Sequence, residues 1–184
     1  MKVCDVFEAA EIGDLPINPA KAAGALGIKT VSYGTMTEIY DIDADYLYRR
    51  SPFGFSFKSE NRFVIAVNEN SCGERKRRFT IAHELGHCVL GHTGRLSENR
   101  APTSFEEHSA DRFAADFLAP LPVLILCGAE SAEEIKKSAG FRVKPQKFVI
   151  KSLFKCAEAI FSRSTKTKKL PRCFRISSSD TARR

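Results

Sequence analysis

The segment formed by residues 78–87, RFTIAHELGH, constrains this chain more than any other because it contains the pattern H-E-x-x-H. In an α-helix, residues four positions apart lie one above the other on the same face. His83 and His87 can therefore direct ring nitrogens at one metal ion about 2 Å away, while Glu84 lies around the helix near the open position of the ion. The pattern is typical of zinc hydrolases, in which the metal lowers the pKa of a water and the glutamate accepts its proton.

A zinc ion in such a site needs a third protein ligand, and Glu107 is the candidate. Glu107 and Asp111 lie four residues apart in the segment SFEEHSAD, residues 104–111. If this segment forms a second helix, Glu107 can bind the metal while Asp111 hydrogen-bonds a ligand histidine and fixes its tautomer. Two histidines, a glutamate and a water form the ligand set of a catalytic zinc site. All four histidines fall between positions 83 and 108, which favours a single site.

Other interpretations of these residues stay open at this point. An isolated H-E-x-x-H pattern can also occur on an ordinary amphipathic helix. Ser104 and Glu107 fit a capping box, in which both side chains satisfy the first backbone amides of a helix. His108 is an alternative third ligand, although the next position along a helix faces about 100° away. His92 follows Gly91, where the first helix is expected to end, and is more typical of a solvated or helix-end cation.

At these residues the chain resembles the ImmA/IrrE family of gluzincin-like zinc metallopeptidases. The matching segments are residues 78–87 and 107–120, with weaker agreement at 16–19, 25–28 and 65–68. The resemblance covers roughly positions 15–125, and the segment after about Gly140 matches nothing in the family. It implies an α+β fold, a zincin-like core in which a small antiparallel or mixed sheet packs on the metal-binding helices.

The resemblance also implies roles for the site residues. It makes His83, His87 and Glu107 the zinc ligands and Glu84 the catalytic base. Asp111 stands where asparagine is common in the family, although aspartate fits the gluzincin pattern equally well. The implied function is that of a zinc-dependent endopeptidase that cleaves a cytoplasmic helix-turn-helix transcriptional repressor or regulator.

Composition and cysteine usage favour a cytoplasmic protein that does not associate with membranes. The chain has 184 residues, of which 43% are hydrophobic, enough for an ordinary globular core. No apolar run approaches the ~18 residues that span a bilayer. Residues 1–8, MKVCDVFE, include acidic residues where a signal peptide would have its apolar stretch. The six cysteines include no C-x-x-C pair, so we expect reduced thiols.

The positive charge of the chain is concentrated near its C-terminal end. Residues 142–184 carry a local net charge of +11, which leaves −4 for residues 1–141 out of the overall +7. We therefore expect two parts, a zincin-like domain with an N-terminal helix over residues 1–140 and a basic, partly flexible C-terminal helix and tail over residues 141–184. Such a tail can contact nucleic acid without sequence specificity. The alternatives are an acidic protein partner and a solvated end without a binding role.

Local patterns predict the elements around the metal helix. A capping box at Ser71 and Glu74 is expected to start this helix, and its basic first turn is typical of a solvated face. In zincin-like enzymes the edge strand beside the metal helix pairs with the substrate, so we expect residues 63–68 to line the cleft. Helices are expected at 19–26, 131–139 and 145–160, a strand at 28–33, and an antiparallel pair of strands at 53–57 and 62–67.

The function that these residues favour is peptide hydrolysis. Zinc polarises the scissile carbonyl, and Glu84 accepts the water proton and passes it to the leaving amine. The alternatives are a regulatory binding module that docks a repressor or DNA without proteolysis, and a zinc hydrolase acting on small peptides. A base at position 84 favours an enzyme, because a pure binding module has no need of one. Candidates for stabilising the oxyanion, unranked, are Tyr33, Tyr40, His92 and Arg112.

Overall fold

The computed structural model describes residues 3–12, 14–71, 73–98 and 100–121, the positions 124, 131 and 134, and the strand at 175–176. By compactness the chain divides into a first unit, residues 1–11 and 18–118, and a second unit, residues 12–17 and 119–184. The predicted boundary between residues 140 and 141 and the predicted helix at 145–160 lie outside the described residues.

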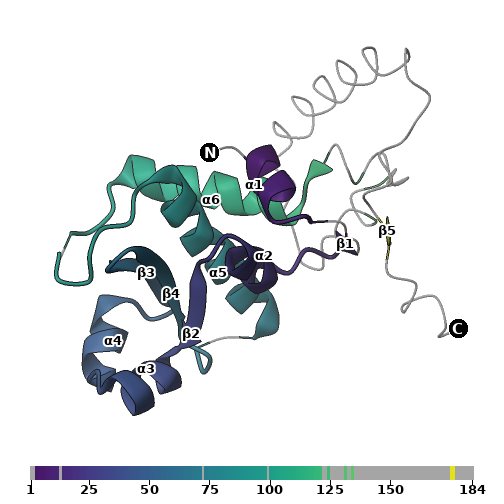
Figure 1. Cartoon of the computed structure of the whole chain (residues 1–184). Helices are drawn as coiled ribbons and strands as arrows, with labels where there is room; N and C mark the ends of the chain where they lie inside the picture. Colours follow the sequence, from purple (N-terminus) through teal and green to yellow (C-terminus); the bar gives the residue numbers. More distant parts are fainter. Residues whose placement is uncertain are drawn as a thin grey trace, which may run out of the picture. The chain divides into compact units, whose positions relative to one another are not determined.

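A three-stranded sheet lies at the centre of the first unit (Figure 1). Its strand order is β2 (Lys29–Ser32), β4 (Arg62–Val67), β3 (Gly54–Ser59), with β4 parallel to β2 and antiparallel to β3. This mixed sheet with its surrounding helices confirms the predicted α+β fold. The expectation that residues 63–68 line the cleft is wrong, because β4 is paired on both sides and the edge strand that lines the cleft is β3.

The two faces of the sheet pack on different helices. Phe55 and Phe57 of β3 join a buried cluster with residues of α3 (Tyr33–Tyr40) and α4 (Ala44–Arg50). Side chains alternate along a strand, so Gly54 and Ser56 face the opposite side, toward α5 (Glu74–Leu90). This alternation presents the small and polar positions of the edge strand to the helix that carries H-E-x-x-H.

Helix α5 ends as the sequence predicts but does not begin as predicted. Gly91 ends it in the left-handed conformation, with φ +81°, which a glycine adopts without strain. At the other end the N-cap is Gly73, which offers no side-chain hydrogen bond, so the predicted capping box is wrong. The Ser71 hydroxyl instead donates to the carbonyl oxygen of Asn68, at 3.1 Å.

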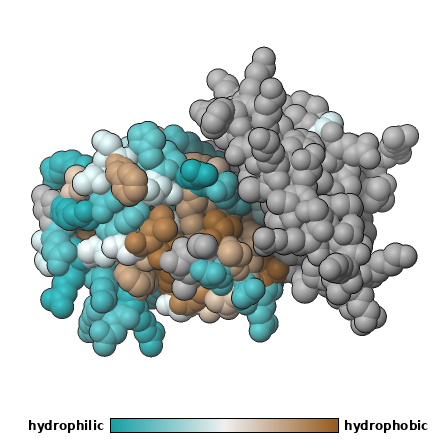
Figure 2. Space-filling model, turned by 90° about the horizontal axis from the view of Figure 1, so that it is seen from above, coloured by the Kyte–Doolittle hydropathy of each residue, from teal (hydrophilic) through white to brown (hydrophobic). Residues whose placement is uncertain are grey.

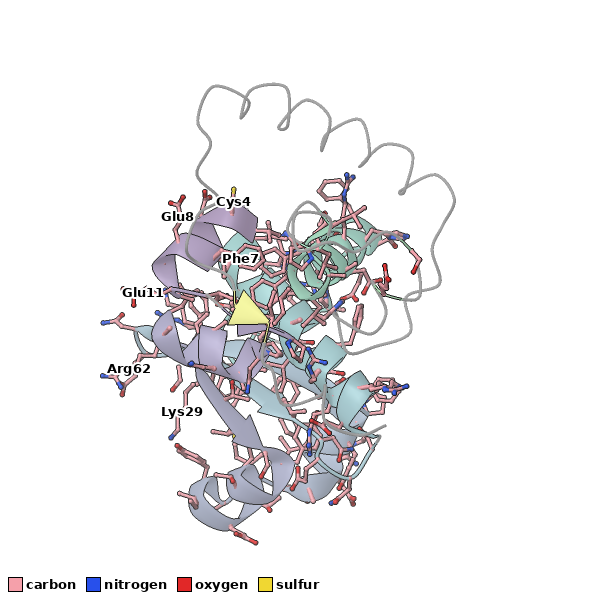
Figure 3. The ribbon with its side chains drawn as sticks, turned by 90° about the vertical axis from the view of Figure 1, so that its right-hand side faces the viewer. Cys4, Phe7, Glu8, Glu11, Lys29 and Arg62 are labelled. Carbon is pink, nitrogen blue, oxygen red and sulfur yellow. The ribbon has the colours of Figure 1, made fainter. Side chains whose placement is uncertain are left out.

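Helix α6 (Ser104–Leu118) packs along α5, and two shorter helices complete the first unit. In α1 (Val3–Ala9), Phe7 lies on the inner side with its ring 5.4 Å from that of Phe117, whereas Cys4 and Glu8 point outward (Figure 3). Helix α2 (Pro19–Ala25) lies where a helix is expected at 19–26, and its N-cap is Asn18, whose side chain accepts two backbone N–H groups. Seen from above, the described residues show hydrophobic side chains gathered among hydrophilic ones (Figure 2).

The second unit contains a short parallel pair of strands, β1 (Asp14–Leu15) with β5 (Arg175–Ile176). Ser131 and Glu134 exchange backbone-to-side-chain hydrogen bonds, 3.1 and 3.3 Å, in the pattern of a capping box at the start of the helix expected at 131–139. Across the described parts of both units, no helix combines the length and the apolar character needed to span a bilayer.

Gly54 should be intolerant of any side chain. A Cβ there would lie 2.8 Å from the carbonyl oxygen of Ala66 and 2.8 Å from Cγ2 of Thr80, so either the sheet or α5 must move. We expect Gly54→Ala to lower the free energy of unfolding by about 1–3 kcal/mol in urea titrations. Gly24→Ala is the control, since a Cβ there meets open space in a helix and should raise stability by about 0.4–1 kcal/mol. An unchanged stability of the Gly54 variant would contradict the close approach.

Candidate metal centre

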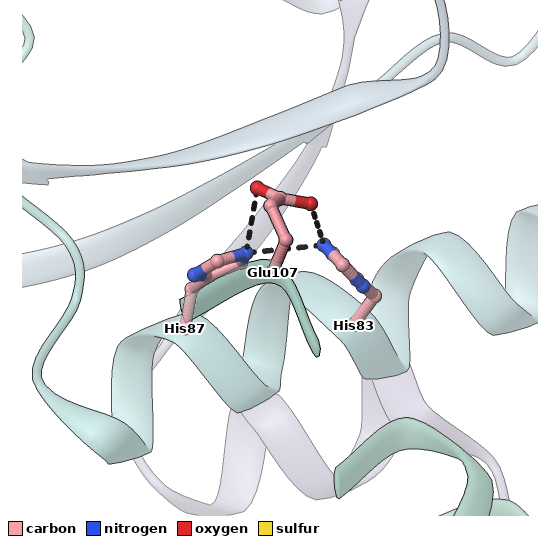
Figure 4. Close-up of side chains that lie close together, drawn as sticks. All are labelled: His83, His87 and Glu107. Atoms are coloured by element: carbon pink, nitrogen blue, oxygen red, sulfur yellow. Dashed lines mark hydrogen bonds and ion pairs between the residues drawn. The ribbon is translucent and has the colours of Figure 1, made fainter. Parts of the chain in front are cut away.

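Three side chains from two helices converge on one point (Figure 4). His83 and His87 project from the same face of α5, and their Nε2 atoms lie 3.0 Å apart. Glu107 of α6 places Oε2 3.4 Å from Nε2 of His83 and Oε1 3.5 Å from Nε2 of His87. The structure therefore brings together the three residues that the sequence selects as metal ligands.

The spacing of these atoms fits a small divalent ion. Two ligand atoms bound at about 2.05 Å in tetrahedral geometry lie about 3.3 Å apart. The three separations of 3.0, 3.4 and 3.5 Å bracket this value. Imidazole nitrogens with one carboxylate oxygen form the donor set of a zinc site that keeps an open position. His83, His87 and Glu107 are thus suited to hold zinc.

The second nitrogen of each histidine also has a partner. Nδ1 of His83 lies 2.8 Å from Oδ1 of Asp111, and Nδ1 of His87 lies 3.2 Å from Nδ1 of His92. When Nε2 binds a metal, Nδ1 carries the proton and donates, so the Asp111 carboxylate accepts from His83 and Nδ1 of His92 is placed to accept from His87. The spacing of the sequence predicts the contact of Asp111 with a histidine, whereas no pattern in it predicts the contact of His92 with His87.

The electrostatic surroundings of His87 suit a metal ligand. Burial, and then repulsion from His83 and His92, lower the pKa of His87 to about 4. Its imidazole is therefore neutral near pH 7, which is the form that binds metals.

Glu84 lies beside the cluster as a buried carboxyl group, 8% exposed. Burial raises its pKa to about 8; hydrogen bonds from the hydroxyl and backbone N–H of Ser56 lower it, and repulsion from Glu107 raises it. Ser56 belongs to the edge strand β3, so this strand and the carboxylate are held together. Nothing in the sequence selects Ser56 except its alternation with Phe55 and Phe57.

A neighbouring glutamate takes the capping role that Glu107 was a candidate for. The backbone N–H of Thr103 donates to Oε2 of Glu106, at 2.8 Å, and the N–H of Glu106 lies 3.3 Å from the Thr103 hydroxyl. Hydrogen bonds from Arg100 and Thr103 lower the pKa of Glu106 to about 2. The alternative box of Ser104 with Glu107 is therefore wrong, and Glu107 points at the histidines.

The remaining candidates lie elsewhere or at the margin of the site. His108 is exposed and directs Nδ1 at the carbonyl oxygen of Ser104, 2.6 Å away, so it does not join the cluster. Of the four residues considered for the oxyanion, His92 lines the cleft. Tyr33 donates its hydroxyl to the carbonyl oxygen of Ser51. Tyr40 and Arg112 form their polar contacts outside the cleft.

The cluster opens into a cleft of about 550 Å³. One wall is the edge strand β3 with residues 49–53 before it, and another is the segment that joins α5 to α6. Side chains of α5 between Lys76 and His87 form the floor. The metal ligands and Glu84 thus face a space that can hold a segment of chain.

A small mixed sheet, a helix with H-E-x-x-H and a glutamate on the next helix are the arrangement of a zincin-like metallopeptidase. The family model of the IrrE N-terminal-like domain matches residues 43–151, more than half of the chain. The chain belongs to this peptidase family, which confirms the resemblance found in the sequence. Searches of characterised proteins and of solved structures gave no significant match.

Adjacent glutamates of α6 should differ sharply in metal binding. We expect Glu107→Ala to abolish stoichiometric zinc binding, because only two protein ligands remain. Glu106→Ala is the matched control: it removes a carboxylate that contacts Arg100 and Thr103 and should leave zinc binding unchanged. Both variants are measured by zinc analysis after gel filtration and by competition with a chromophoric chelator. Equal losses in the two variants would contradict the assignment.

Asp111 should strengthen metal binding without touching the ion. Its carboxylate accepts from Nδ1 of His83 and so orients the ring. We expect Asp111→Ala to weaken zinc binding about 10- to 100-fold in the same competition assay. Arg112→Ala, one residue further on the exposed side of α6, should have no effect on the zinc affinity. An unaltered affinity of the Asp111 variant would show that the hydrogen bond does not orient the ligand.

Proposed function

We propose that this protein is a zinc-dependent endopeptidase. The observation that carries the proposal is a buried carboxylate, Glu84, beside a cluster of two histidines and a glutamate at the floor of an open cleft. A structural zinc site has no use for such a group, because its four ligands close the coordination sphere. Membership of a peptidase family agrees with this proposal.

In the proposed reaction Glu84 transfers protons. A bound zinc ion supplies Lewis-acid polarisation of the scissile carbonyl and the attacking water, and its charge favours the ionised form of a neighbouring carboxylate. Glu84 accepts the proton of the water and then delivers it to the leaving amine. The hydrogen bonds from Ser56 hold the carboxylate in place between these transfers. Of the four candidates for assisting the oxyanion, His92 is the one that lines the cleft.

The edge of β3 at Gly54 and Ser56, before Lys58 bonds the carbonyl oxygen of Gly94, is the proposed binding site for substrate backbone. The N–H of Asn68 donates to the carbonyl oxygen of Phe53. In an antiparallel pair, every second residue hydrogen-bonds the partner strand, so Phe53, Phe55 and Phe57 bond the side of β4. The backbone groups of Gly54 and Ser56 therefore point away from β4. The N–H groups of these two are taken by Ser51 and Glu84, which leaves their carbonyl oxygens to accept from a peptide. The substrate segment is therefore extended, as in a linker.

The substrate that we propose is a helix-turn-helix repressor or regulator in the cytoplasm. This part of the proposal rests on the resemblance of residues 78–87 and 107–120 to the ImmA/IrrE peptidases. An extended linker between folded domains of such a regulator suits a cleft that binds backbone. The predicted contact of the basic tail with nucleic acid remains a proposal as well, and would bring the enzyme near a DNA-bound regulator.

Glu84→Gln should abolish cleavage while keeping zinc and substrate binding. The amide has nearly the same shape but cannot accept the water proton, so we expect the rate to fall at least about 100-fold. The measurement is intact-protein mass spectrometry of a helix-turn-helix regulator encoded beside the gene for this protein, after incubation with each variant. Glu98→Gln is the control, since this carboxylate also lines the cleft but accepts from the backbone of Arg95.

Two fragments that appear with the parent protein and the Glu98 variant, but not with Glu84→Gln or with chelator, would support the endopeptidase. An uncut regulator that binds a zinc-loaded protein would contradict proteolysis of this substrate. That outcome favours the alternative function, a binding module with a zincin fold that docks a repressor or DNA.

A further inference from the structure

The charged residues that line the cleft are divided between its two ends. Lining residues numbered 49–80 include three cations and no carboxylate, whereas those numbered from 83 onward include Glu84, Glu98, Glu107 and Asp111. Of the two cations in the later group, Arg100 is bound through both oxygens of Glu106. The cations of the first group are Arg49, Arg50 and Lys76. Below, these three are called the basic end.

The basic end is built from the meeting of two helix termini. Arg49 and Arg50 form the last turn of α4, and Lys76 lies in the first turn of α5. Lys76 places Nζ 3.1 Å from the ring centroid of Phe53, and Arg50 lies over the ring of Phe55, 5.2 Å from its centroid. These aromatic contacts hold the cations beside the open end of strand β3 without neutralising their charge.

Acidic neighbours offset the charges of Arg49 and Lys76 only weakly. Arg49 pairs with Asp43 at 3.7 Å, but both side chains are largely exposed, and such a pair is readily exchanged for another. At the start of α5, one acidic residue, Glu74, is followed by four consecutive cations at positions 75–78. Cations near a helix N-terminus are electrostatically unfavourable, so folding gains nothing from this concentration. A binding partner with negative charge would gain from it.

We infer that the basic end is a specificity subsite that selects an acidic side chain in the peptide substrate, an inference that rests on the proposed endopeptidase function. Glu84 lies beside Ser56, and the basic end flanks Phe53, three residues along β3. Three residues of extended chain span about 10 Å. The acidic residue therefore lies two to four positions from the scissile bond. Phe53, partly exposed, adds an apolar surface for the stem of that side chain.

A peptide fits this division of charge better than a nucleic acid. A polyanion lying along the cleft would place phosphates near Glu98 and Asp111 at the other end, two carboxylates that are not among the proposed metal ligands. A peptide with one or two acidic residues places negative charge only at the basic end. The backbone acceptors of the β3 edge also suit a peptide, whose N–H groups repeat along the chain.

The test is cleavage of a proteome-derived peptide library, with fragment termini identified by mass spectrometry. We expect Asp and Glu to be enriched at least threefold at one position two to four residues from the cut. In Arg49→Gln/Lys76→Gln, which changes two exposed side chains, this enrichment should vanish while cutting continues. Arg62→Gln is the control, because Arg62 points outward from the sheet, outside the cleft (Figure 3).

A binding measurement separates this inference from the proposed function. The Glu84→Gln protein is titrated with a fluorescent decapeptide that contains three consecutive Glu residues and with its Gln analogue. The acidic peptide should bind three- to tenfold more tightly, and the double variant should lose that difference. This titration shows whether the subsite selects acidic residues even if the parent protein cuts nothing. Absence of cutting would count against the endopeptidase function alone.

Three results would overturn the subsite. They are cleavage without acidic enrichment, enrichment that persists in the double variant, and equal binding of the two decapeptides. Tighter binding of a single-stranded oligonucleotide, lost in the double variant, would also overturn it and assign the basic end to nucleic acid. Circular dichroism of each variant confirms that the fold is retained.

Discussion

The packing of α6 against α5 is the contact on which the site depends. Glu107 reaches the two histidines of α5 because the helices approach closely at Gly86, where a Cβ would lie 3.0 Å from a ring carbon of Phe113 and 3.3 Å from Cα of Ala110. Metal–ligand distances are fixed within about 0.2 Å. A larger residue at position 86 would displace α6 and take the carboxylate out of range. The glycine within H-E-L-G-H therefore serves geometry rather than flexibility.

A second close approach joins the helix to the sheet. Gly54 lets β3 lie directly on Thr80, one turn before the first histidine, and two residues later Ser56 hydrogen-bonds Glu84. The strand proposed to hold the substrate and the carboxylate proposed to move protons thus belong to one packed unit. Catalytic positioning requires tolerances well below 1 Å, which a strand held only by its sheet neighbours would not provide.

The parts of the structure that depend on local sequence could be predicted. The four-residue spacings that select His83 with His87 and Glu107 with Asp111 are helical geometry, and the structure brings these four side chains together. Asn18 as an N-cap and the hairpin of β3 with β4 follow from local patterns in the same way. The functional roles of the four residues remain predictions, since geometry alone does not show turnover.

Two predictions, the strand that lines the cleft and the alternative capping box at the start of α6, failed because each is decided by a contact outside its own segment. Whether β3 or β4 lies at the sheet edge is set by pairing with β2, more than thirty residues away, and no local pattern encodes it. The capping motif at the start of α6 fits the sequence in two frames, Thr103 with Glu106 and Ser104 with Glu107. Arg100 resolves this ambiguity, because its guanidinium binds Glu106 through both oxygens and fixes the first frame. A single arginine in the connecting loop thus leaves the adjacent glutamate available for a metal.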